Sequence, residues 1–210
     1  MKNLIQSLLL LGSLVTLLAL SSCKKDEPTP INGLTIGSQK YPFSKGWMIP
    51  IDTGYVYVIL ASNTVSDSFT GTGNLLFGSF AVAANSTTLN TGIYALNDNG
   101  DPMTCDGLSF WLNADVNYAE PNYVISPVWN TNKTVSVAKE SNKYVFTFSG
   151  LVAKDSLGVD KTTSANIKVP LTVLDPVIFE AKASDFGMSA NQFLMTRRKI
   201  QSFRQRRAQQ

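Results

Sequence analysis

Apolar and polar residues alternate most regularly between residues 133 and 150 of the chain. The alternation stops at a polar turn, residues 140–142, and resumes after it. Its apolar members on the two sides of the turn are Val135, Val137, Tyr144, Phe146 and Phe148. A period of two on both sides of a polar turn predicts a β-hairpin with one face against a core.

Shorter apolar runs separated by Gly, Asn and Ser predict further strands. These runs cover residues 34–36, 39–43, 54–62, 71–85, 91–100, 107–115 and a segment starting near Ala165. The run 54–62 is aromatic and β-branched, which indicates a strand buried on both faces. Gly78 is a candidate β-bulge, and Pro170 places the last strand at a sheet edge or at a bulge.

Together the runs predict an all-β domain over residues 33–180, with about eight or nine strands. Frequent turns fit an antiparallel β-sandwich or an open β-barrel, and the pattern does not distinguish the two. The composition agrees with this fold class, because 44% of the residues are hydrophobic and only 16% are charged.

The N-terminal region has a different pattern. A basic start is followed by an apolar run of 17 residues, 4–20, and then by the small residues Ser21 and Ser22. This order predicts a signal helix that forms a lipoprotein signal peptide over residues 1–22. A retained membrane anchor is the alternative, because the run is near the lower length limit for a membrane-spanning helix.

The sequence Leu20-Ser21-Ser22-Cys23 resembles the bacterial lipobox, in which the cysteine becomes the diacylated first residue of the mature chain. The resemblance implies that Cys23 is a lipid attachment site and that acyl chains anchor the protein in a membrane. Residues 23–32, which include two prolines, are the expected tether between anchor and domain.

The run Lys24, Lys25, Asp26 and Glu27 is similar to the export signal of surface lipoproteins of the Bacteroidota. This similarity implies a lipid-anchored protein of the outer membrane, exposed at the cell surface. A plain solvated linker, which leaves the domain facing the periplasm, is the alternative.

Residues 20–174 as a whole resemble a widespread, loosely defined group of Bacteroidota lipoproteins. The segments that carry the resemblance are "NGLTIGSQKYPF", "GTGNLLFGSF", "LNTGIYAL" and "KTVSVAKESNKYVFTFSGLVAKDSLG". These motifs are structural and include no catalytic signature. The resemblance therefore implies a location and a fold class, and it says little about a ligand.

Residue composition excludes several kinds of chemistry. The chain has no histidine, which excludes Ser-His-Asp and Cys-His catalysis and all histidine metal sites. Once Cys23 is acylated, Cys105 is the remaining cysteine, so the mature protein has no intramolecular disulfide. Cys105 is expected to be a small buried apolar residue. No cofactor is expected.

Residues 181–210 form a basic C-terminal tail. Residues 197–210 hold six basic residues and no acidic ones, whereas residues 23–196 hold 11 basic and 15 acidic residues. The composition favours a helix with Phe193, Ile200 and Phe203 on one side, but arginines interrupt that apolar stripe. A frayed extension is the main expectation, contact with an anionic surface is the alternative, and nucleic acid is not an expected partner.

A cluster of aromatic residues is the strongest candidate for a binding surface. Trp111, Tyr118, Tyr123 and Trp129 lie in one Pro- and Asn-rich segment, residues 111–129. Aromatic side chains on the loops of a β scaffold stack on sugar rings or anchor a protein partner. The alternative is that these side chains cap the core.

Three weaker candidates remain. Asn97, Asn99 and Asp101 are spaced two apart as in a calcium loop, but a bidentate glutamate is missing, which favours an ordinary polar turn. Ser156, within Asp-Ser-Leu, lies in a tripeptide that resembles the O-glycosylation motif of exported Bacteroidota proteins. The carboxylates that could form a pair of the kind used in glycoside hydrolysis are Asp106, Asp115 and Glu120.

The first function hypothesis is therefore a non-catalytic binding module for a glycan or a protein, held at the membrane by a lipid. The second is a structural envelope lipoprotein that acts by assembly with other membrane components. A carboxylate-based glycoside hydrolase comes last, because the chain lacks histidine and a nucleophile motif.

Overall fold

Short β-strands make up almost all the regular structure of the computed structural model, which describes residues 32–52, 54–67, 70–83, 86–115 and 121–176. The strands are β1 (Gly33–Ile36), β2 (Gln39–Pro42), β3 (Lys45–Asp52), β4 (Tyr55–Ala61), β5 (Thr72–Ala81), β6 (Gly92–Leu96), β7 (Thr104–Asp115), β8 (Tyr123–Ile125), β9 (Thr134–Glu140), β10 (Lys143–Asp155), β11 (Asp160–Val169) and β12 (Leu171–Val173). A single 3-10 helix, η1 (Pro127–Trp129), follows β8 in this part of the chain.

Several predictions made from the sequence concern residues outside these described ranges. The signal peptide, Cys23, the Lys24–Glu27 run, nearly all of the tether and the C-terminal tail lie outside the described residues. Among the residues that are described, no helix has the length and apolar character needed to cross a membrane.

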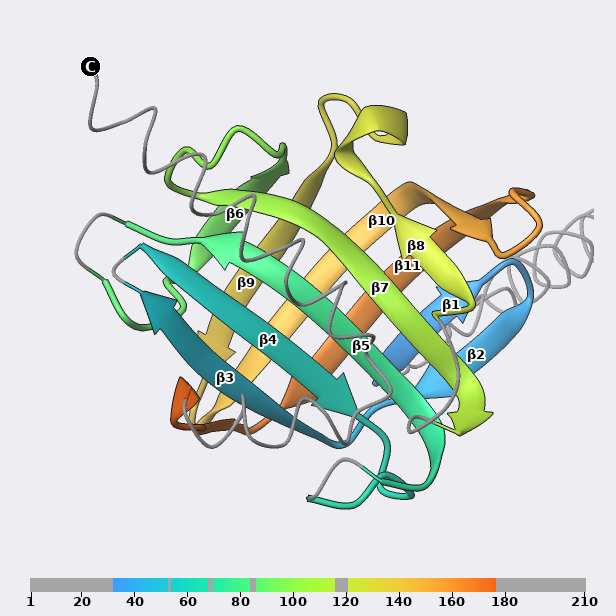
Figure 1. Ribbon diagram of the computed structural model, residues 1–210, viewed down its shortest axis with the longest axis horizontal. Coiled ribbons are helices and arrows are strands. Elements are labelled where there is room, and N and C mark those ends of the chain that lie inside the picture. Colours follow the sequence, from blue (N-terminus) through green and yellow to red (C-terminus); the bar gives the residue numbers. More distant parts are fainter. Residues whose placement is uncertain (1–31, 53, 68–69, 84–85, 116–120, 177–210) are drawn as a thin grey trace, which may run out of the picture. The chain divides into compact units, whose positions relative to one another are not determined.

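The described strands form one sheet in the order β12-β3-β4-β5-β7-β6-β9-β10-β11-β1-β2. Strands β3, β4, β5 and β7 form the front layer in Figure 1, and β9, β10 and β11 lie behind them. Strand β8 pairs with both β7 and β10 and so joins the two layers.

The all-β prediction is confirmed. The expectation of a purely antiparallel sheet is wrong, because β12 pairs in parallel with β3, and β6 pairs in parallel with β7. The expected count of strands is also too low, since twelve are described.

The hairpin predicted from the alternating pattern is β9 and β10. Glu140 pairs with Lys143, and Ser141 in the turn between them has a φ of 56°. The side chains of Val135, Val137, Phe146 and Phe148 are all buried. The period-two pattern therefore identified both strands and the face that packs on the core.

Strand β4 is buried along its whole length, as its composition predicted. Val56, Val58 and Leu60 point into the cluster between the two layers, whereas Tyr57 and Ile59 point to the opposite face of the sheet. Alternate residues of a strand point to opposite faces, so both faces of the front layer are apolar.

The cluster between the layers is the main core. Phe80 of β5 lies with its ring 6.2 Å from that of Phe146 of β10, which joins front and back layers directly. Phe80 also contacts Tyr94 of β6 edge-to-face, with ring centroids 5.1 Å apart. Edge-to-face contacts of this kind add to the stabilisation gained from burial.

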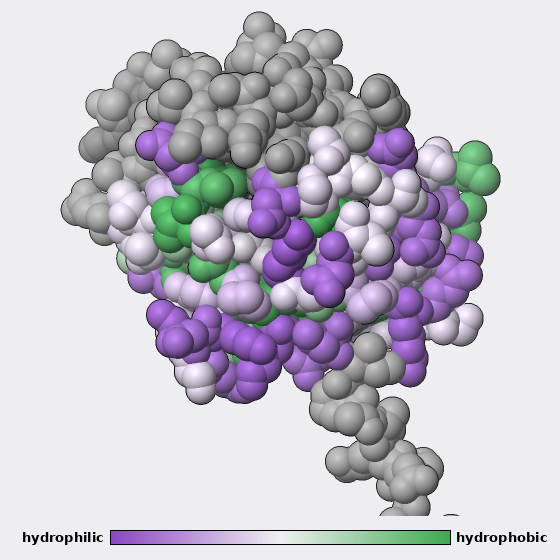
Figure 2. Space-filling view, turned by 90° about the horizontal axis from the view of Figure 1, so that it is seen from below, coloured by the Kyte–Doolittle hydropathy of each residue, from purple (hydrophilic) through white to green (hydrophobic). Residues whose placement is uncertain are grey.

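A second cluster covers the opposite face of the front layer, which we call the outer face. Its buried members come from β3, β4, β5, β7 and the loop after β4: Trp47, Ile49, Tyr55, Tyr57, Ile59, Ala61, Val65, Leu75, Phe77, Ala81 and Trp111. In the view from below, hydrophilic residues gather along the lower part of the described surface, and apolar residues are exposed in smaller patches (Figure 2).

The structure corrects the predictions made for Gly78 and Pro170. Gly78 is not a bulge, because it keeps regular register with Val58 and Leu108. The two β5–β7 register shifts fall between Gly73 and Leu75 and between Ser79 and Phe80. A Cβ at Gly78 would lie 2.7 Å from Leu108, so this glycine permits close packing. The strand predicted from near Ala165 is β11, which pairs with both β10 and β1, so the edge prediction is wrong for it. Pro170 lies just after β11 and separates it from β12, which is at the sheet edge.

Burial of Cys105 and Tyr94, both 0% exposed, predicts loss of stability in alkali. Burial raises the pKa of the Cys105 thiol well above its ordinary 9.0, and that of Tyr94 well above 10.0. Above these ordinary values the unfolded chain loses protons that the native state keeps, so the free energy of unfolding falls as pH rises. The slope approaches about 1.4 kcal/mol per pH unit for each group.

Urea unfolding at pH 7, 9, 10 and 11 measures this effect. In Cys105→Ala we expect the fall in the free energy of unfolding that begins near the ordinary thiol pKa of 9.0 to be absent. The fall caused by Tyr94 should persist. Identical pH profiles for the two proteins would refute the assignment to Cys105.

Candidate functional site

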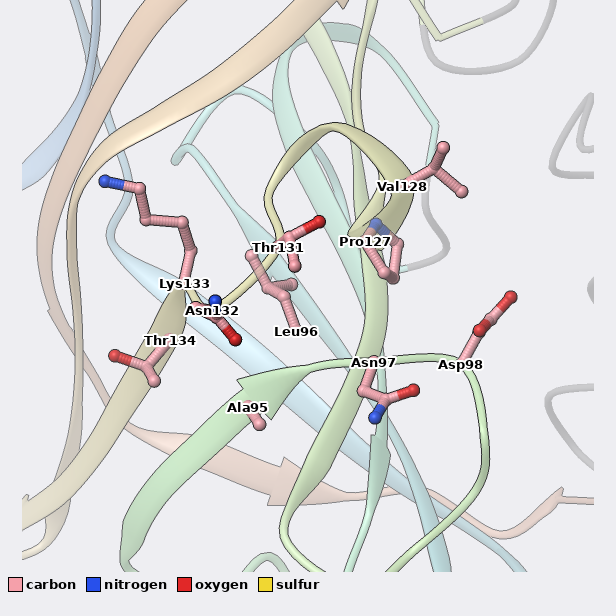
Figure 3. A pocket seen from close by; sticks show the side chains of 10 residues that line it. All are labelled: Ala95, Leu96, Asn97, Asp98, Pro127, Val128, Thr131, Asn132, Lys133 and Thr134. Carbon is pink, nitrogen blue, oxygen red and sulfur yellow. The ribbon is translucent and has the colours of Figure 1, made fainter.

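A hollow of about 450 Å³ lies between the end of β6 and the segment that contains η1 (Figure 3). Pro127 and Thr131 reach it from the η1 segment, and Asn97 and Asp98 from the loop after β6, with Leu96 between them. The other lining residues are Ala95, Val128, Asn132, Lys133 and Thr134. We call this site the η1 hollow.

The η1 side of the hollow is held by one buried side chain. Asn130 is 1% exposed, and its Nδ2 donates to the carbonyls of Ser126 at 3.0 Å and Val152 at 2.9 Å. Its Oδ1 accepts from the Val152 N–H at 2.7 Å. These bonds tie η1 to β10, so Val128 and Trp129 are displayed from a fixed turn.

The β6 side of the hollow is fixed by backbone bonds. The Leu96 N–H donates to the Lys133 carbonyl at 2.9 Å, and the Asn97 N–H donates to the Cys105 carbonyl at 3.1 Å. The first of these bonds joins the two walls of the hollow directly. The site is therefore largely preformed, as binding sites for small molecules usually are.

The spacing of Asn97, Asn99 and Asp101, which resembles a calcium loop, arises from the turns of the loop after β6. The Asn97 side-chain oxygen accepts from the Asn99 N–H at 3.0 Å, and the Asn99 oxygen accepts from the Asp101 N–H at 3.1 Å. Both amide oxygens thus close turns of the polar loop, which is the alternative that the missing glutamate favoured. No cluster of three metal-ligating side chains occurs in the described part of the chain.

The η1 hollow is polar but electrically balanced. Its charged lining residues are Asp98 and Lys133, and the rest are amides, hydroxyls and small apolar groups. In Figure 3 the Lys133 side chain extends away from the centre of the hollow. This lining suits a ligand with many hydroxyls and no net charge better than a phosphate or a carboxylate.

Trp129 is the last residue of η1, follows the lining residue Val128 in sequence, and is 42% exposed. The Lys154 Nζ lies 4.9 Å from the centroid of its indole ring, and the same ammonium pairs with Asp160 at 2.9 Å. A cation over an aromatic face is attracted to the ring, so this contact orients the indole at the surface.

A second hollow of about 540 Å³ lies where β2, β4, β5 and β7 have their ends, and it includes Asn74 and Asn113. Its polar groups largely bond one another. The Asn74 Nδ2 donates to the Pro42 carbonyl at 3.2 Å, and its Oδ1 accepts from the Asn113 N–H at 3.0 Å. The η1 hollow, whose η1 turn also carries the exposed Trp129, is the better candidate site.

The structure separates the aromatic residues of segment 111–129. Trp111 is 3% exposed and belongs to the outer-face cluster, whereas Tyr123 packs against the core between the layers. Trp129 is exposed, and Tyr118 lies outside the described residues. The expectation of one exposed aromatic surface therefore does not hold for Trp111, which is part of the packing.

The carboxylate pair proposed for hydrolysis is also separated. Asp106 and Asp115 lie nine positions apart near opposite ends of β7. At about 3.3 Å per residue this spacing is about 30 Å, whereas glycoside hydrolysis needs roughly 5–10 Å. Asp106 accepts a hydrogen bond from Ser79 at 3.2 Å. Glu120 lies outside the described residues.

Ser156 lies in the exposed turn between β10 and β11. The Asp155 side chain accepts from the Leu157 and Val159 N–H groups at 3.0 and 2.8 Å, which fixes this turn. The hydroxyl is at a protruding position that an enzyme could reach, and its glycosylation stays a prediction.

Sequence reasoning did not identify the η1 hollow. Its walls come from residues 95–98 and 127–134, which the β6–β9 pairing brings together. Asn130, which fixes the η1 wall, looks like any other turn asparagine in the sequence.

Comparison of the chain with protein-family models, curated proteins and solved structures gives no match.

Proposed function

We propose that this chain is a lipid-anchored surface protein whose β domain is a non-catalytic binding module for an uncharged glycan. The observation that carries the proposal is the η1 hollow, a preformed polar site lined in part by the same η1 turn that carries the exposed Trp129. The lipid anchor and the surface location rest on the lipobox-like sequence at Cys23 and on the basic-acidic run after it.

The chemistry of the hollow favours a sugar over a protein ligand. Amide and hydroxyl groups of Asn97, Thr131 and Asn132 match the alternating donors and acceptors of a sugar ring. Pro127 and Leu96 add apolar surface for the C–H groups of the same ring. The exposed Trp129 indole on the same turn would stack on another sugar ring of a bound glycan.

Binding to a panel of immobilised neutral and acidic glycans tests the proposal. We expect the intact protein to retain neutral glycans. We expect Trp129→Ala to bind them more weakly, with a dissociation constant raised about tenfold or more, equivalent to about 1.4 kcal/mol. The measurement is the dissociation constant of the best glycan, taken with the melting temperature of each variant.

Leu157→Ala is the matched control, because Leu157 is 86% exposed on the β10–β11 turn and does not line the hollow. It should bind as tightly as the intact protein. Unchanged affinity in Trp129→Ala, or retention of acidic glycans alone, would contradict the proposed site.

A further inference from the structure

The outer face of the front layer is buried although the described elements provide no layer over it. Tyr57, Ile59 and Trp111 are 1%, 0% and 3% exposed. The described neighbours of this cluster outside its four strands are Val65, which is a member, and Leu174, which packs against it. One loop residue and one strand-end residue are too few to cover four strands of apolar side chains.

We infer that residues 177–210 of the same chain cover the outer face. The other residues outside the described set are the N-terminal 31 and internal gaps of one to five residues. Those gaps are too short to cover such an area. Cleavage before Cys23 would remove the apolar N-terminal run, and the residues that follow it are mostly polar.

The path of the chain leads to this face. Strand β12 pairs in parallel with β3 at the edge of the front layer, and the Leu174 N–H donates to the Met48 carbonyl at 2.9 Å. The Leu174 side chain packs against the outer-face cluster, and Pro176, two residues later, is the last described residue. Residue 177 therefore starts beside the surface that needs a cover.

The length of the segment is sufficient. Four neighbouring strands at about 4.8 Å spacing span about 15 Å between the first and the last. The segment has 34 residues, which reach about 50 Å as a helix. It can therefore cross from β3 to β7 and still extend beyond them.

Composition and charge also fit. Ten apolar residues of the segment are Val177, Ile178, Phe179, Phe186, Met188, Phe193, Leu194, Met195, Ile200 and Phe203. The segment has seven basic and two acidic residues, whereas residues 32–176 have eight basic and 11 acidic ones. The opposite net charges of the two parts favour their contact.

The arginines that interrupt the apolar stripe do not oppose this arrangement. Long basic side chains lay their aliphatic stems on apolar surface and keep the charged group in water. An acidic residue also lies on the path of the chain toward this face, since Asp175 directly follows Leu174, which packs against the cluster.

Photo-crosslinking in the full acylated chain, held in detergent, tests the inference. Benzoylphenylalanine replaces Phe193, and equal amounts of ¹⁴N and ¹⁵N protein are mixed before irradiation. We expect crosslinks within one chain to peptides that contain Trp47, Ile59, Phe77 or Trp111. The same probe at position 157, on the exposed β10–β11 turn, is the control and should not reach these peptides.

Other occupants give other results. Crosslinks between ¹⁴N and ¹⁵N chains would overturn the inference and assign the face to a second copy. Crosslinks to detergent, or none to the outer face, would overturn it by placing the segment away from the sheet. None of these results bears on the glycan proposal, because neither Phe193 nor the outer face lines the η1 hollow.

A chain that stops after Pro176 gives a second readout. With Trp129→Phe in both proteins, indole fluorescence reports Trp47 and Trp111, the remaining two of the three tryptophans. We expect acrylamide quenching to rise several-fold on truncation and to fall again when a peptide of residues 177–210 is added. Equal quenching of the folded proteins would contradict the inference, and crosslinking decides if the shortened chain does not fold.

Discussion

Replacing Trp111 with alanine is expected to destabilise the domain by about 3–5 kcal/mol, the cost typical of removing a buried tryptophan. Trp111 is 3% exposed on β7, where it pairs with Leu75 of β5 in the outer-face cluster. Its removal leaves a cavity among large side chains, including the Tyr57 and Phe77 rings, which lie 5.0 Å apart. Urea unfolding at pH 7 measures the change as a lower midpoint with an unchanged slope.

Trp129→Ala is the matched control, because it removes the same side chain from an exposed position. Surface substitutions of this kind change stability by about 0.5 kcal/mol or less. We therefore expect the two tryptophans to divide by role, with Trp111 needed for folding and Trp129 for ligand binding. A loss below about 1 kcal/mol in Trp111→Ala would mean that the outer face is not packed, and the proposed cover by residues 177–210 would fall with it.

Local patterns predicted the strands whose neighbours lie close in the sequence. The β9–β10 hairpin follows from alternation and a short turn, and β4 follows from its unbroken apolar composition. Strand β3 was missed because Pro50 interrupts its pattern. Strand β12 pairs with β3 only as far as Met48. On that side of β3, therefore, no described strand lies opposite Pro50 to accept a hydrogen bond, and the missing N–H of the proline is tolerated.

Pairings between distant segments could not be predicted. The parallel contacts of β6 with β7 and of β12 with β3 depend on the path of the whole chain. The same limit applies to the site, since the described aromatic residues of segment 111–129 are close in sequence but point to different faces. One strand, β7, turns Trp111 outward while its neighbour Phe110 faces the core between the layers.

Replacing Cys23 with alanine is expected to abolish lipid labelling and membrane association together. Acylation adds about 0.8 kcal/mol of membrane affinity per buried methylene group, and two or more chains hold a protein almost permanently. Cys23 carries the only thiol of the lipobox-like sequence Leu20-Ser21-Ser22-Cys23, and a thioether-linked lipid needs a thiol. Growth with an alkyne fatty acid, followed by membrane fractionation, measures both properties.

Cys105→Ala is the control, because Cys105 is the one other cysteine of the chain and is fully buried in the core. It should keep the label. If the unaltered protein takes up no lipid label but still sediments with membranes, the apolar run 4–20 is a retained anchor and the lipoprotein proposal is wrong.

Protease treatment of intact cells then separates the two faces of the outer membrane. Surface display predicts that the domain is digested in intact cells, and that changing Lys24, Lys25, Asp26 and Glu27 to alanine protects it while the lipid label remains. Protection of the unaltered protein until the outer membrane is broken would place the domain in the periplasm. An assembly role would then explain the chain better than a glycan site, because large extracellular glycans do not reach that compartment.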